Sequence, residues 1–104
     1  MRLRWIGLVV FACSSGVLAL AGCGPTLYTI NAIPAGSAVA EAEEAGAVEN
    51  APYEYWYAHE HLDKAHEEAS EASYEDAARY ADIAEEFGTK ARELARRRMR
   101  EMGR

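Results

Sequence analysis

Three histidines and several carboxylates lie between residues 59 and 67, and imidazole and carboxylate groups are side chains that bind divalent ions such as zinc. On a helix, His59, Asp63 and His66 would occupy positions i, i+4 and i+7 of one face. A metal motif such as His-Glu-x-x-His is absent, and no cysteine lies nearby. We therefore favour the alternative, a solvated helix face with polar i, i+4 contacts, and predict no metal and no cofactor.

The remaining polar residues show no arrangement typical of a catalytic site. Ser37, Ser70 and Ser73 are accounted for by linker and capping positions, and no Gly-rich phosphate loop is present. The carboxylates are expected on solvated faces, whereas a catalytic acid or base needs an isolated site that shifts its pKa. We predict that the protein is not an enzyme.

Cys23 carries the clearest chemical signal in the chain. Leu20, Ala21 and Gly22 precede it, after a start with two arginines and an apolar run over residues 5–20. A charged start, a short apolar segment and small residues before the cleavage site are typical of a secretory signal peptide. With a cysteine directly after them, these residues resemble a lipobox, where lipoprotein signal peptidase leaves a diacylated cysteine as the new N-terminus.

Two alternatives to a lipoprotein signal remain open. A membrane-spanning helix needs roughly 20 residues, and the apolar run has only 16. Ordinary secretion, with cleavage near Ala19 or Ala21, would leave Cys23 as a free thiol. The preferred prediction is a signal peptide over residues 1–22 and lipidation of the cysteine that follows. Because Gly24 is not the aspartate that retains lipoproteins at the inner membrane of enteric bacteria, we expect an outer-membrane location facing the periplasm.

Cleavage after Gly22 leaves 82 residues with 17 acidic and nine basic groups, a formal net charge of −8. Cys13 leaves with the signal peptide, so no disulfide can form. A chain of this length makes one small domain, and such domains bury only about 60% of their unfolded surface. Stability then depends on close helix packing, a partner or self-association. Nucleic acid is not an expected partner outside the cytoplasm.

The mature chain divides into a tether and a helical domain. Residues 23–36 contain two prolines and two glycines without a helical period, which predicts a lipidated, flexible tether. Within it, Tyr28 and Ile30 are apolar enough to rest on lipid or to pack on the body. Alanine and glutamate then predict a short helix over residues 37–46, with Gly46 where that helix ends.

The helical domain, residues 37–104, continues with two heptad patterns. Apolar residues recur at spacings of three and four over residues 51–71 and again over residues 74–100. Ser73 and Asp76 resemble a capping box that starts the second pattern. The prediction is an all-α domain in which a short helix precedes an antiparallel helical hairpin. One continuous helix is the alternative, since the turn holds neither glycine nor proline.

Most seam positions are alanine, which lets helices approach closely but contributes little apolar area. The larger side chains expected to supply most of the burial are Tyr55, Trp56, Leu62, Tyr80, Ile83, Phe87 and Leu94. Gly88 costs its helix about 1 kcal/mol relative to alanine, which indicates a place where a neighbouring backbone approaches closely. So thin a core favours a third helix, which residues 37–46 could supply, or self-association.

Four features carry a family resemblance: the lipobox, Ala51-Pro52 at a helix start, Leu62-x-x-Ala65, and Tyr74-x-x-Ala77-x-x-Tyr80-Ala81-x-x-Ala84. Over residues 23–95 they resemble the alanine-rich bacterial lipoproteins grouped as domain of unknown function 4398. The resemblance implies a periplasm-facing helical domain on a lipid anchor, with no catalytic or binding residues to transfer. Relatives place a Gly-Asp type pair where this chain has Ala72-Ser73. The packing is also similar to one tetratricopeptide (TPR) unit, although three repeats are normally needed for stability.

Four aromatic side chains occur within five residues, too many for one helix face to bury: Tyr53, Tyr55, Trp56 and Tyr57. In one interpretation they pack against the first helix and the far end of the last. In the other, Tyr53, Trp56 and Tyr57 contact a protein partner, a glycan or the membrane interface, where rings with a polar tip are favoured.

Charge is divided sharply along the chain. Residues 41–86 hold 15 acidic and two basic groups, whereas residues 87–104 hold seven basic and two acidic groups. In one interpretation the basic groups complement the helix C-terminus and pair with acids such as Glu93 and Glu101. In the other, a projecting basic end with Met99 and Met102 contacts anionic lipid or an acidic partner. The arginines concerned are Arg96, Arg97, Arg98 and Arg100.

Together these patterns predict an outer-membrane lipoprotein that acts as a non-catalytic interaction or scaffold module of the cell envelope. Its expected partners are the membrane, through the lipid anchor, and an envelope protein. The alternative is a structural lipoprotein whose alanine seams pair between copies to form a homo-oligomer. A histidine-based metal binder is the third hypothesis.

Overall fold

The computed structural model describes residues 23–103, which form helices joined by short turns. The helices are α2 (Cys23–Glu44), α3 (Ala47–Asn50), α4 (Pro52–Ser70) and α5 (Tyr74–Met102). The expected signal peptide, with Leu20, Ala21 and Gly22, lies outside the described residues. None of the described helices combines the length and the apolarity that crossing a membrane requires.

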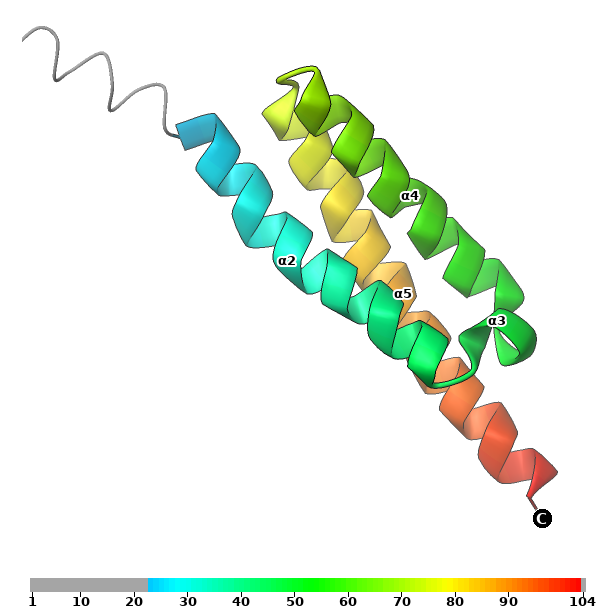
Figure 1. The fold of residues 1–104 in the computed structure, drawn as a ribbon. Helices are drawn as coiled ribbons and strands as arrows, with labels where there is room; N and C mark the ends of the chain where they lie inside the picture. The colour runs from blue at the N-terminus through cyan, green and yellow to red at the C-terminus, as the bar shows by residue number, and fades with distance from the viewer. Residues whose placement is uncertain (1–22, 104) are drawn as a thin grey trace, which may run out of the picture.

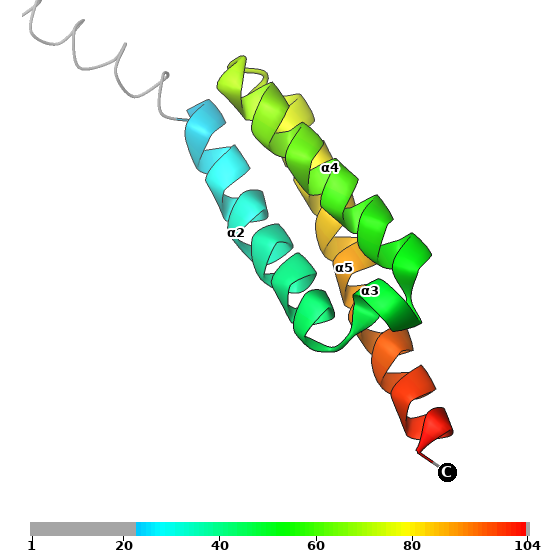
Figure 2. The same ribbon diagram turned by 45° about the vertical axis from the view of Figure 1, so that its right-hand side comes forward.

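The two longest helices, α2 and α5, run side by side in the same direction, and α4 runs antiparallel to both (Figure 1). The turned view shows the same arrangement, with α3 as a single turn that joins the end of α2 to the start of α4 (Figure 2). The helices α4 and α5 form the predicted antiparallel hairpin, and α2 supplies the third helix that the thin core favours. The all-α fold class is therefore confirmed, and one continuous helix is excluded.

The first helix starts much earlier than expected. The sequence predicts a flexible tether over residues 23–36, whereas α2 begins at Cys23 and continues through Pro34. Pro25 lies in the first turn, where a proline removes no intrahelical hydrogen bond. Pro34 does remove one, but Ala35 directly after it is fully buried in the three-helix body. The difference from the predicted tether has a physical reason. Contacts of α2 with the other helices outweigh the low helix propensity of its prolines and glycines.

Backbone hydrogen bonds shape the hairpin turn. The amide of Ser73 donates to the carbonyl of Glu68 at 2.9 Å, and the amide of Ala72 donates to the carbonyl of Ala69 at 3.1 Å. These two bonds make a Schellman motif. Ala72 has a φ of 62°, the left-handed conformation that glycine adopts most easily. Ser73 makes no side-chain cap hydrogen bond, so the capping box expected with Asp76 does not form.

The core is thin, as predicted, because nearly all of the buried side chains are alanine. Within residues 23–103, only Val39 and Tyr55 are both larger than alanine and buried. Of the other large side chains expected in the core, Trp56 is exposed, and the remainder are half-buried: Leu62, Tyr80, Ile83, Phe87 and Leu94. Stability therefore depends on many small contacts between closely approaching helices.

Candidate functional site

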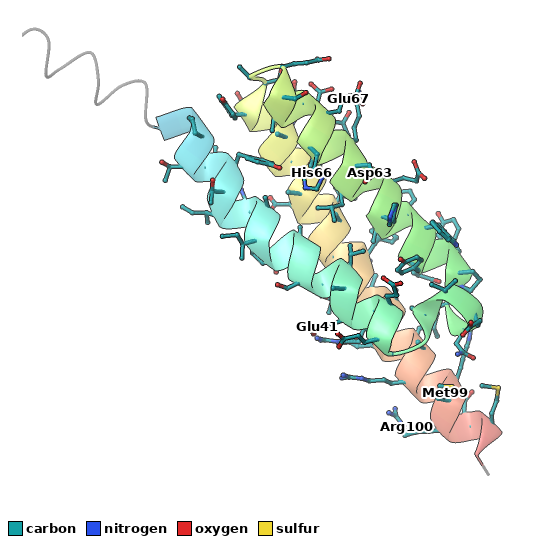
Figure 3. The ribbon with its side chains drawn as sticks, in the orientation of Figure 1. Glu41, Asp63, His66, Glu67, Met99 and Arg100 are labelled. Carbon is teal, nitrogen blue, oxygen red and sulfur yellow. The ribbon has the colours of Figure 1, made fainter. Side chains whose placement is uncertain are left out.

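The histidines and carboxylates of α4 make a pair contact and no larger cluster. His59 Nδ1 lies 3.3 Å from Asp63 Oδ2, so two members of the predicted stripe meet. His66 lies further along the same helix (Figure 3). Over the described part of the chain, no three histidine, cysteine or acidic side chains are placed to hold one ion. This face of α4 therefore provides a solvated polar contact between His59 and Asp63, four residues apart.

An aromatic patch, which we define as Tyr53, Trp56 and Tyr57, lies at the start of α4. The exposed fractions of Tyr53 and Trp56 are 68% and 46%. Tyr57 lies against α5, with its ring centroid 4.2 Å from that of Phe87. An open depression of about 440 Å³ is lined by Pro52, Tyr53, Trp56, Tyr57, Glu60 and His61. Amphipathic rings around a shallow depression suit a flat ligand or a protruding partner side chain.

His61 fixes the orientation of Tyr57 within this patch. The two rings stack with their centroids 4.2 Å apart. His61 Nδ1 lies 2.7 Å from the carbonyl oxygen of Tyr57, and because a carbonyl only accepts, Nδ1 is the donor. The imidazole is thereby held against its own helix.

Tyr55 enters the core instead of joining the patch. It is buried among residues of α2 and α5, and its ring meets that of Trp56 edge-on at 5.0 Å. Burial raises the pKa of Tyr55, and so does the nearby carboxylate of Glu43 on α2. The four clustered aromatics are therefore divided: Tyr55 packs in the core, Tyr57 packs on α5, and the other two face solvent.

The basic tip, which we define as Arg96, Arg97, Arg98 and Arg100, occupies the end of α5 that extends past α2 and α4 (Figure 1). All four arginines are exposed. Arg98 donates a hydrogen bond to the backbone carbonyl of Asn50. In the described residues no ion pair joins these arginines to a carboxylate, so the expected pairing with Glu93 and Glu101 is not formed. Met99 and Met102 are exposed beside them.

Sequence reasoning missed a third surface, the outer face of α2. Of the two residues considered for lipid contact, Tyr28 packs against a buried cluster, whereas Ile30 is exposed. Leu27 and Ile33 are exposed with it. Leu27, Ile30 and Ile33 recur every three residues in a segment without charged side chains, and this spacing could have indicated the face. It was not recognised because the segment was interpreted as a flexible tether.

A family model described as a domain of unknown function, DUF4398, matches residues 33–103. The match includes all of α3, α4 and α5 and the second half of α2. No curated protein and no solved structure matches the chain. A family without an assigned function transfers no activity, so function has to be argued from the surfaces.

Proposed function

We propose, from the premise that this chain belongs to the DUF4398 family, that it is a lipid-anchored lipoprotein of the bacterial outer membrane and a non-catalytic interaction module of the periplasm. The observation that carries the proposal is the lipobox from Leu20 to Cys23. Cys23 is also the first residue of α2, so acyl chains on it would attach the helical body to the bilayer without a linker. Each buried methylene adds about 0.8 kcal/mol, and two or more chains anchor a protein stably.

The body is better suited to binding than to catalysis. Catalytic acids and bases are usually tuned by burial or by a charged neighbour in a cleft. Within residues 23–103 the buried titratable side chain is Tyr55, which is enclosed in the core and not in a cleft, and no histidine, carboxylate, lysine or arginine side chain is buried. The depression at the start of α4 is open and lined mainly by aromatic rings. These features support a surface that recognises a partner.

Two surfaces are suited to a partner, the aromatic patch and the basic tip. Tyrosine, tryptophan and arginine are the residues most enriched at the interface positions that contribute most of the binding free energy. The remainder of the body is strongly acidic. An acidic partner would therefore be attracted to the tip and repelled elsewhere, which orients its approach.

Self-assembly through the alanine seams is disfavoured by the packing of α2. The seam residues Ala58, Ala65, Ala84 and Ala91 are fully buried within a single chain. They are therefore not free to pair with a second copy, and an oligomer would need a different surface.

The anchor is tested with two cysteine variants of the full chain. We expect Cys23→Ala to release the protein from membranes into the soluble fraction, because the acylated sulfur is lost. Cys13→Ala is the matched control, since that residue leaves with the signal peptide, and it should stay on membranes. Mass spectrometry of the native protein should find a lipid-modified Cys23 as the first residue. Membrane sedimentation of Cys23→Ala after a salt wash would contradict the proposal.

The partner surfaces are tested by photo-cross-linking in cells. A cross-linking amino acid at Trp56 or at Arg98 should give adducts with an envelope protein. The same amino acid at Arg79, which is exposed on α5 away from both surfaces, is the control. Equal adducts at all three positions would show non-specific contact and would count against an interaction role for these surfaces.

A further inference from the structure

The outer face of α2 exposes large aliphatic side chains close to the start of the helix. Leu27, Ile30 and Ile33 are 47%, 64% and 66% exposed, respectively. Spaced three residues apart, they span about 9 Å along the helix, and the first lies about 6 Å along the axis from Cys23. Exposed aliphatic side chains gathered in this way usually mark a contact surface.

The same part of the chain carries no charge. Residues 23–40 contain no acidic or basic side chain, whereas the 46 residues that follow hold 15 acidic groups. The uncharged face ends in the last turn of α2, where Glu41 and Glu44 are exposed. An anionic bilayer repels carboxylates, so this is the part of an otherwise acidic body that can approach one without charge repulsion.

Beyond the end of α2, arginines on α5 lie on the same side of the molecule as this face. Arg92 on α5 pairs with Glu41 on α2, which places Arg92 on the α2 side of its helix. Arg96 follows at i+4 on the same face, and Arg100 at i+8 lies about 80° further round the helix. Figure 3 shows Glu41 and Arg100 along the same edge of the molecule. Aliphatic side chains near Cys23 and arginines at the far end therefore share one side of the body.

We propose that the outer face of α2 lies on the bilayer surface, with the basic tip reaching anionic head groups, so that the body lies along the membrane instead of standing upright on its anchor. The proposal rests on the proposed lipidation of Cys23, which places the aliphatic stripe next to the acyl chains. Exposed aliphatic side chains beside a lipid anchor add apolar area that can be buried at the head-group boundary. The aromatic patch on α4 is then left free for a partner.

The orientation is tested with spin labels on the full, processed protein in vesicles of phosphatidylethanolamine and phosphatidylglycerol. Labels at Ile30→Cys and Ile33→Cys report on the α2 face. A label at Asp63→Cys, whose side chain is 61% exposed on α4, is the control of matched exposure. We expect the α2 labels to collide with lipid-soluble oxygen and to be shielded from a water-soluble nickel chelate, with the reverse at Asp63→Cys. Equal access of the chelate to all three labels would overturn the proposal.

The role of the arginines is tested with a label at the exposed Met102→Cys position. On anionic vesicles this label should be shielded from the chelate. Replacing Arg96 and Arg100 by glutamine should weaken association of the tip about fivefold for each arginine removed at low salt. On pure phosphatidylethanolamine the same replacements should change nothing. An equal loss on both vesicle types would overturn the head-group contact.

Two further outcomes separate this inference from its alternatives. Spin–spin broadening at Ile30→Cys that disappears on dilution with unlabelled protein would mean that a second copy covers the face, and the membrane orientation would be rejected. Mass spectrometry of the same samples tests independently whether Cys23 carries lipid. If Cys23 carries no lipid, the proposed function fails, while the labels still report whether α2 contacts the vesicles.

Discussion

Gly88 on α5 lies against Ala38 on α2 with no space for a side chain between the helices. A Cβ placed on Gly88 would be 2.9 Å from the carbonyl carbon of Ala38 and 3.0 Å from its Cβ. The expectation that this glycine marks a close backbone approach is confirmed. The contact also explains how a helix with two prolines is held in place, because closely packed backbones make many dispersion contacts.

We predict that Gly88→Ala destabilises the fold, because the new methyl group meets backbone that cannot move easily. Overpacking costs about 1–3 kcal/mol, and the better helix propensity of alanine offsets about 1 kcal/mol of that. Gly36→Ala is the matched control, since a Cβ there meets nothing within 4 Å, and it should stabilise by up to about 1 kcal/mol. Thermal unfolding followed by circular dichroism measures both. A gain in melting temperature for Gly88→Ala as large as that for Gly36→Ala would contradict the close contact.

Ala72 should be improved by glycine, because its left-handed conformation strains a residue with a Cβ. We expect Ala72→Gly to raise the free energy of unfolding by about 1 kcal/mol, measured by urea denaturation. Ala69→Gly, three residues earlier inside α4, should lower it by about 1 kcal/mol. A loss of stability in both variants would mean that the turn does not require the left-handed conformation.

The hairpin was predictable because the sequence pattern that specifies it lies within α4 and α5 themselves. Apolar spacing of three and four residues marks α4 and α5, and a costly glycine inside a helix identified the contact at Gly88. The start of α2 was not predictable in this way. Its prolines and glycines indicate an irregular segment, and the helix exists because Ala38 meets Gly88, which lies 50 residues further along the chain.

The candidate surfaces were predictable to a similar extent. The charge division placed the basic tip correctly, since a run of like charges is seldom buried. The burial of Tyr55 was predictable from its place in the first heptad pattern, whereas Trp56, which the sequence also placed among the side chains that supply burial, is 46% exposed because it lies about 100° further round the helix. Ser73 shows the same limit, since the backbone bonds of the turn replace the side-chain cap that the sequence indicated.

The ion pair between Glu41 and Arg92 should contribute modestly to the packing of α2 on α5. A double-mutant cycle with Glu41→Gln and Arg92→Gln should give a coupling energy of about 0.2–1 kcal/mol at low salt, since both side chains are partly exposed. High salt should reduce the coupling through screening. The comparison pair is Glu86 and Lys90, an i, i+4 pair within α5. A coupling of zero at low salt would mean that other contacts hold α2.

Tyr55 should make the stability of the fold sensitive to alkali. Its pKa is raised above the ordinary value of 10.0 by burial and by Glu43, so the unfolded phenol ionises before the folded one. The stabilisation is therefore complete below about pH 10 and is lost as the pH rises through the higher pKa of the folded state. Tyr55→Phe should cost about 1 kcal/mol at neutral pH through the lost interaction of the phenol with Glu43.

The distinguishing measurement is the free energy of unfolding from about pH 8 to about pH 11 for both proteins. The difference between the unmodified protein and Tyr55→Phe should shrink toward the alkaline end, because only the former has this phenol to ionise on unfolding. Tyr53→Phe, which removes an exposed phenol outside the core, controls for the general effect of alkali. A difference that stays constant over this range would show that the pKa of Tyr55 is not raised in the folded protein.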